Sequence, residues 1–195
     1  MTKYSKIALC ALVFGAFTLT SCSKSDSAAP ASIYTRLGGT TLVADPDPGV
    51  PAGQTIEAGR LAYRKVIDKT IQLIIADVQT NASGNLSAHF APLLSETGTT
   101  QATNLAELRD NLTDFFSYNT GGTDAVNTYS GLSMADAHNP AVNTRMGVKA
   151  NAANYTKFEG YVGAAAVANG VAANTQLYTD IVAVLESLRP TIVQQ

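Results

Sequence analysis

The chain contains two histidines, His89 and His138, and their setting decides which metal chemistry the sequence supports. They are 49 positions apart, and neither belongs to a His-x-x-x-His or Glu-x-x-His pattern. A zinc or di-iron centre needs three or four ligands arranged in such patterns. The sequence also lacks the Gly-x-Ser-x-Gly motif of serine hydrolases and a glycine-rich phosphate-binding loop. These observations leave chemistry that needs only one histidine.

A haem of the b type meets this condition. It needs one imidazole for its iron, a flat apolar slot and a few polar groups for its propionates. His138 ends the segment Tyr129-Ser130-Gly131-Leu132-Ser133-Met134-Ala135-Asp136-Ala137-His138, which follows an apolar helical stretch ending at Gly121-Gly122. His138 is therefore a candidate for the single protein ligand of a haem iron. The plainer alternative is a histidine on a polar surface.

The N-terminus has the features of a bacterial lipoprotein signal peptide over residues 1–21. Two lysines precede an apolar stretch, residues 7–19, that is too short to span a bilayer comfortably as a helix. The stretch closes with Leu19-Thr20-Ser21-Cys22, which resembles a lipobox, so we expect cleavage before Cys22 and lipidation of this cysteine. Several acyl chains anchor a protein durably to a bilayer. An ordinary secretory signal or an uncleaved anchor is the alternative.

Residues 22–31 are expected to form the lipidated cysteine and a flexible tether, because they contain small and charged side chains and no bulky apolar residue. One domain, residues 32–195, follows. Both cysteines, Cys10 and Cys22, precede it, so it has no disulfide. Loss of residues 1–21 changes the balance of 13 basic and 15 acidic side chains to 11 and 15. No basic cluster remains, and nucleic acid is therefore not an expected partner.

Hydrophobic periodicity predicts an all-α domain, because apolar residues recur at helical spacing and no useful alternating pattern appears. Asn104 is expected to cap one of the helices, with Glu107 three residues later. The proline- and glycine-rich residues 43–53 are expected to form a loop. The longer expected helices cover residues 55–80, 104–120, 152–169 and 173–193, and shorter ones lie near residues 33–37, 86–94 and 132–138.

Five segments in order resemble truncated haemoglobins, especially group I. Residues 32–39 are similar to the opening of that family, and residues 108–122 to its distal helix with a terminal glycine pair. Residues 129–138 are similar to the segment that carries the proximal histidine. Residues 146–148 and 188–193 resemble the Met-Gly-Ile and C-terminal segments that follow. The resemblance covers most of residues 32–195.

This resemblance implies a globin-like, truncated two-over-two helical sandwich around haem b, with His138 as the proximal ligand of the iron. Phe90 would be the aromatic contact at the haem edge, and Leu108, Leu112 and Phe116 would line the distal side. The resemblance further implies reversible binding of O2, NO or CO by a protein of the cell envelope, anchored in the membrane through Cys22.

Three positions depart from the family. Ile71 stands where a tyrosine usually donates a hydrogen bond to bound O2, and Leu112 stands where a glutamine does. Asn111 replaces a basic partner of a propionate. Because these donors are missing, we do not expect high-affinity O2 storage or efficient NO dioxygenation. Insertions are expected at residues 45–54, near 80–85 and at 139–145.

Two other interpretations remain open from the sequence. A helical lipoprotein without haem would use its surface as a binding module. Alternatively, His89 would supply a sixth ligand and make a bis-histidine haem protein for electron transfer, although His89 is first expected in an exposed position beside the haem edge. The sequence does not identify the gas, a redox partner or the oligomeric state.

Overall fold

The computed structural model describes residues 29–122 and 125–195. The chain divides into two units, Met1–Pro30 and Ala31–Gln195, and the described helices all belong to the second. The expected signal peptide, Cys22 and most of the tether lie outside the described residues. Within the described ranges, no helix combines the length and apolar character that a membrane span requires.

The domain is mostly helical, as the periodicity predicts, and the described residues contain seven α-helices. A short 3-10 helix, η1, covers Ala125–Asn127. The helices are α1 (Ile33–Arg36), α2 (Ala58–Gln79), α3 (Ala91–Ser95), α4 (Gly98–Asn119), α5 (Met134–Ala137), α6 (Ala152–Ala168) and α7 (Gln176–Ile192). Two short strands, β1 (Leu42–Ala44) and β2 (Thr55–Glu57), precede α2.

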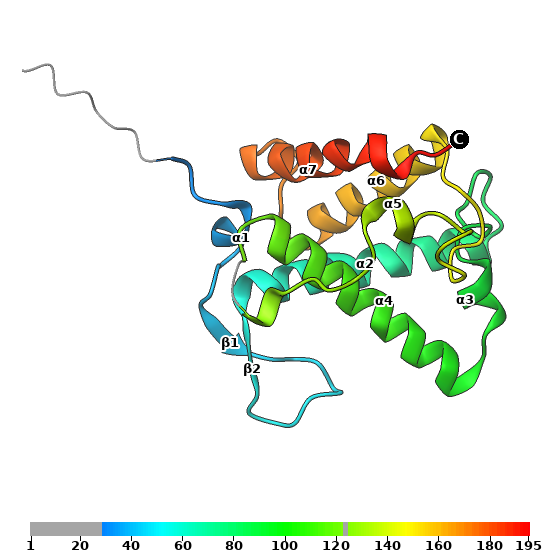
Figure 1. Ribbon diagram of the computed structural model, residues 1–195. Helices are drawn as coiled ribbons and strands as arrows, with labels where there is room; N and C mark the ends of the chain where they lie inside the picture. The colour runs from blue at the N-terminus through cyan, green and yellow to red at the C-terminus, as the bar shows by residue number, and fades with distance from the viewer. Residues whose placement is uncertain (1–28, 123–124) are drawn as a thin grey trace, which may run out of the picture. The chain divides into compact units, whose positions relative to one another are not determined.

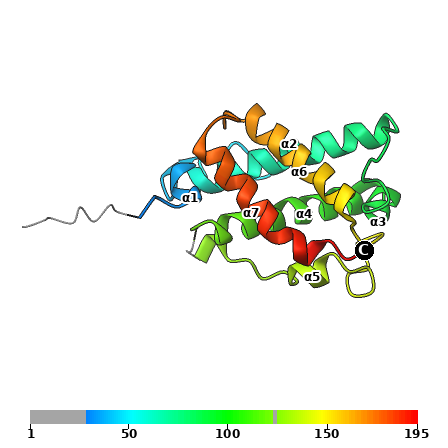
Figure 2. The same cartoon turned by 90° about the horizontal axis from the view of Figure 1, so that it is seen from above.

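Four long helices form two packed layers. The most extensive contacts join α2 to α4, α2 to α6 and α6 to α7. Figures 1 and 2 show the α6–α7 pair lying across the α2–α4 pair, with α5 and the loop after it near the C-terminal end of α7. Each long helix must bury an apolar stripe, and this arrangement lets the stripes of all four meet.

The main core lies where these layers meet. Phe116 stacks on Tyr63 with ring centroids 6.1 Å apart and contacts the edge of Phe115. The Tyr63 hydroxyl donates a hydrogen bond to Thr120 Oγ1 at 2.7 Å, so its polar end is satisfied inside the core. The buried members of this cluster are Tyr34, Tyr63, Ile67, Phe115, Phe116, Val162 and Leu185.

The expected helices differ from the observed ones mainly at α4. Asn104 is not its N-cap, because the helix begins six residues earlier at Gly98. Instead, the Asn104 side chain donates to Glu96 Oε2 at 2.9 Å, and the Gln101 side chain donates to the carbonyl of Leu93 at 3.1 Å. These two hydrogen bonds stabilise the first turns of α4, which have no apolar stripe of their own. Ser133 caps α5, since its hydroxyl accepts from the Asp136 N–H.

The expected loop over residues 43–53 is largely confirmed, except that its first two residues belong to β1 of a small β-hairpin. β1 and β2 pair antiparallel, with Val43 opposite Ile56, and the connection between them returns the chain to α2. Each strand has only three residues, too few for an alternating pattern to be recognised in the sequence. Arg64 of α2 forms ion pairs with Asp45 and Asp47 of the connection, which holds the hairpin against the helix.

Candidate functional site

A cavity of about 540 Å3 lies beside His138. Its walls come from α2, α4, α5 and α6, from the turn before α3, and from the loops on either side of α5. Five of the six side chains that the sequence analysis assigns to cofactor binding line it, and so does His89. Those five are Ile71, Phe90, Leu108, Leu112 and His138. The volume is within the range of about 300–1,000 Å3 that is usual for cofactor and ligand sites.

His138 follows the last residue of α5 and has one ring nitrogen committed to the backbone. Its Nδ1 lies 2.9 Å from the carbonyl oxygen of Met134, one helical turn earlier. A carbonyl only accepts, so Nδ1 carries the proton and Nε2 keeps its lone pair. The Asn143 side chain donates to the carbonyl of Ala137 at 2.8 Å and ties the following loop to the end of the helix. The ring is therefore fixed in the tautomer that can bind a metal through Nε2.

The environment of His138 favours the neutral ring. Burial lowers the pKa of His138 below its ordinary value, while the hydrogen bond to the Met134 carbonyl opposes that effect. The neighbouring His89 lowers the pKa of His138 further, because a charge on one ring disfavours a charge on the other. A neutral imidazole is the form that coordinates metals.

The cavity-facing side of α4 differs from the expected one at a single position. Leu108 and Leu112 line the cavity as expected, but Phe116 does not, and Phe115 takes its place. Phe116 is buried in the core against Tyr63 instead. At about 100° per residue, Phe115 returns to within about 20° of Leu108, whereas Phe116 is displaced by about 80°. The spacing of four and four that includes Phe116 is therefore less well aligned than the spacing of four and three that includes Phe115.

Two other predicted contacts lie on separate walls. Ile71, half-buried on α2, lines the cavity beside Thr70, whose hydroxyl is already donated to the carbonyl of Val66 at 2.8 Å. Phe90 precedes α3 and packs on the second core cluster, which contains Ile74. The walls contributed by α2 and α4 are thus largely apolar near the core.

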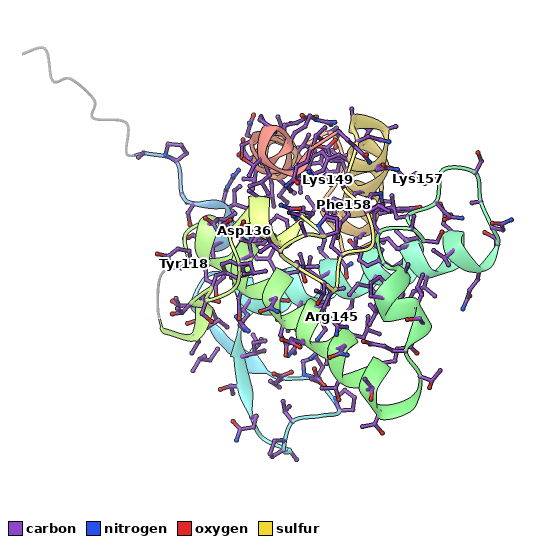
Figure 3. All side chains as sticks on the ribbon, turned by 45° about the vertical axis from the view of Figure 1, so that its right-hand side comes forward. Tyr118, Asp136, Arg145, Lys149, Lys157 and Phe158 are labelled. Carbon is purple, nitrogen blue, oxygen red and sulfur yellow. The ribbon has the colours of Figure 1, made fainter. Side chains whose placement is uncertain are left out.

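Polar groups gather at the rim of the cavity. Arg145 forms an ion pair with Glu96, with Nη1 3.2 Å from Oε1, and Glu96 also accepts from Asn104. Arg145 belongs to the loop that follows α5, and Figure 3 shows its side chain beside α4; Phe158 of α6 lines the same cavity. The half-exposed guanidinium is a cation at the mouth of an apolar cavity, as a carboxylate-bearing ligand would require.

His89 is buried, which corrects the expectation of an exposed side chain. It is 5% exposed, lines the cavity, and its Nδ1 lies 3.1 Å from the carbonyl oxygen of Val148. The Gly147 N–H donates to the His89 carbonyl at 2.9 Å. A Cβ on Gly147 would lie 1.9 Å from the Ala88 carbonyl oxygen, so only glycine allows this close approach.

Sequence reasoning missed three features of this site, namely the burial of His89, the cavity-facing Phe115 and the position of Arg145 at the rim. The burial of His89 and the position of Arg145 depend on contacts between segments far apart in the chain, whereas the helical spacing from Leu108 already favours Phe115. For His89 the available signal was Gly147, because a glycine after an apolar residue and beside a loop insertion is consistent with close backbone packing.

The comparisons with known proteins give no further assignment: neither a model of a protein family nor a curated protein sequence matches this chain.

Proposed function

We propose that residues 32–195 form a truncated-globin-like domain that binds haem b through Nε2 of His138 and reversibly binds a diatomic gas, O2, NO or CO. The domain would be held at the membrane of the cell envelope by the lipidated Cys22. The proposal combines the family resemblance of the sequence with the chemistry of the cavity. It does not include an enzymatic activity.

One observation carries most of the weight, namely the hydrogen bond from His138 Nδ1 to the Met134 carbonyl beside a large apolar cavity. It leaves the metal-binding nitrogen without a hydrogen bond from any described residue. A surface histidine has no need of a fixed tautomer, whereas an axial ligand gains basicity and a set orientation from such a bond. This argues against the plainer alternative for His138.

The other residues present also fit a haem. The cavity is lined with apolar side chains of α2, α4 and α6, which suit the faces of a macrocycle, and its volume suits a cofactor. Arg145 at the rim is a cation that a propionate needs, although it must share its charge with Glu96. Among the described residues no group of three or more histidines, cysteines or acidic residues could hold a bare metal ion, so a macrocycle is the better match.

Haem iron supplies the coordination position at which a diatomic gas binds. His138 would hold that iron and donate electron density through its neutral ring. Ile71, Leu108 and Leu112 would give the gas an apolar surrounding that admits small neutral molecules and excludes charged ones. Because none of these three side chains donates a hydrogen bond, bound O2 would be released readily, which disfavours tight O2 storage and NO dioxygenation.

The test is haem reconstitution of the purified protein and of the His138→Gly variant. We expect the unchanged protein to take up haem with a Soret band that shifts on addition of CO to the reduced form. In His138→Gly the affinity for haem should fall by about 100-fold or more, because the axial ligand itself is lost. Added imidazole should restore the spectrum, since it can occupy the space of the missing ring.

The matched control is Phe116→Leu, which disturbs the core beside the cavity without changing a proposed ligand. It should lower the free energy of unfolding and leave the haem spectrum unchanged. A protein that takes up no haem, or an identical Soret band in His138→Gly, would contradict the proposal. Failure to take up haem would leave the helical lipoprotein that acts as a binding module.

A further inference from the structure

His89 is the polar side chain that the proposed function does not yet use. It is one of seven buried polar or charged residues among those described, and the only one of them besides Thr70 that lines the cavity. A buried imidazole costs free energy unless its polar atoms are satisfied. Its Nδ1 is satisfied by the Val148 carbonyl, while no described residue forms a hydrogen bond with its Nε2.

The two histidines therefore have the same arrangement. In each ring Nδ1 faces a backbone carbonyl, at 2.9 Å in His138 and at 3.1 Å in His89. Since a carbonyl only accepts, both rings are Nδ1–H tautomers when neutral, and both retain a lone pair on Nε2. A lone pair of this kind cannot donate a hydrogen bond to a bound gas, but it can bind a metal.

The position of His89 is set by backbone contacts on both sides. Its carbonyl accepts from the Gly147 N–H, and Gly147 lies so close to Ala88 that a side chain there would collide with the backbone. The ring is therefore held by the loop that follows α5, and it reaches the cavity from a different segment than His138 does. A ligand held in this way needs little reordering to bind.

The number of ligands identifies the kind of metal centre. Two imidazoles alone make a weak site for a bare ion, and the described residues offer no third histidine, cysteine or acidic residue in a common cluster. A haem supplies four equatorial nitrogens, so two imidazoles complete six-fold coordination. We propose that His89 Nε2 is the second axial ligand of the haem held by His138, which rests on the proposed function.

This second bond would regulate gas binding at the same iron. With both axial positions taken, a gas binds only after His89 leaves, so His89 acts as an internal competitor. His89 is tied through its Nδ1 and its carbonyl to residues 147–148 rather than to α2 or α4, so its displacement would involve that loop. Such a bis-histidine centre would also suit electron transfer.

The experiment records absorbance and electron paramagnetic resonance of the haem-loaded protein and of His89→Phe, which keeps an aromatic ring in the buried site. The unchanged protein should be low-spin in the ferric and ferrous states. His89→Phe should retain haem, become high-spin, and bind CO at least about tenfold faster, since no internal ligand must first leave. Circular dichroism checks that the variant is folded.

The outcomes separate the two proposals. A haem-loaded protein that is already high-spin, or whose low-spin spectrum persists in His89→Phe, overturns the second ligand and leaves His138 as the only one. The first of these results needs no variant, so it does not depend on the folding of His89→Phe. A protein that binds no haem removes the proposed function and the second ligand with it.

Discussion

Polar side chains are paired differently in two regions of the molecule, the connection between β1 and β2 and the cavity beside α5. In the connection every charge has a partner from this chain. Arg64 forms ion pairs with Asp45 and Asp47, and Nη1 of Arg109 on α4 lies 2.9 Å from Oδ2 of Asp47. The Arg64 guanidinium holds the pKa of Asp45 below its ordinary value against the opposing effect of burial, and the Gly49 N–H does the same for Asp47.

In the cavity, by contrast, His89 and His138 both line the wall, and each has only its Nδ1 bound to a backbone carbonyl. Burial lowers the pKa of His138 instead of a charged partner stabilising its ion. The ion-pair network of Arg64, Asp45 and Asp47 stabilises the fold and requires no ligand. The Nε2 atoms of the two histidines form no hydrogen bond with a described residue, which leaves both nitrogens available to a ligand.

The largest effect is expected when the ion-pair network of the β1–β2 connection loses the cation that its two aspartates share. Arg64→Ala leaves Asp45 and Asp47 without the cation that they share and should lower the free energy of unfolding by about 3–5 kcal/mol, measured by urea denaturation. Haem uptake of the folded fraction should not change. Arg109→Ala is the control, because its more exposed pair should cost only about 1 kcal/mol. Equal losses in the two variants would contradict a central role of Arg64.

A smaller effect is expected at the loop that holds His89. Gly147→Ala places a Cβ against the Ala88 carbonyl, so the loop must move, at a cost of about 1–3 kcal/mol. The displacement should also change the haem spectrum, unlike the loss of Arg64. Gly160→Ala is the matched control, because nothing lies within 4 Å of its Cβ on α6. It should stabilise the protein by about 0.5–1 kcal/mol. An unaltered spectrum in Gly147→Ala would show that the loop does not position the ring.

The smallest expected effect concerns the dependence of the free energy of unfolding on pH in the haem-free protein. Each of the two regions should lose stability in a pH range of its own. The pKa of His138 is lowered by folding, so the unfolded chain takes up a proton first, and stability falls as the pH drops below about 6.5. The pKa of Asp45 is also lowered by folding, but its stabilising contribution is lost only as the pH falls below about 3.8. Both losses occur on acidification, in separate pH windows.

Variants assign these windows to the two regions. His138→Gln should flatten the dependence of the free energy of unfolding on pH just below 6.5, and Asp45→Asn should flatten it only below 3.8. Urea denaturation over a series of pH values measures both. If Asp45→Asn altered the upper window, the hairpin connection and the cavity would be electrostatically coupled rather than independent.

Much of the helical framework could be predicted from local patterns. α2, α6 and α7 lie within a few residues of their expected bounds, because their apolar stripes repeat over several turns. The cap at Ser133 was also predictable, since it depends on bonds within four residues. The start of α4 was not, because the bonds that hold its first turns come from Glu96 and Leu93 outside the helix.

The candidate site divides in the same way. His138, Leu108 and Leu112 could be selected from spacing and from the family resemblance. Helical geometry also favours Phe115 over Phe116, since Phe115 returns closer to the direction of Leu108, but only the neighbours of α4 decide that Phe116 meets Tyr63. Periodicity defines a face to within about one side chain, whereas packing against α2 chooses the exact orientation.

By itself the amino-acid order determined where helices form and that one histidine follows a short capped turn, because these properties depend on residues a few positions apart. Only the tertiary structure decided that His89 is buried beside the same cavity, since that requires the loop at Gly147 to meet the backbone before α3. Burial depends on which distant segments pack together, and no local pattern of a single polar residue carries that information.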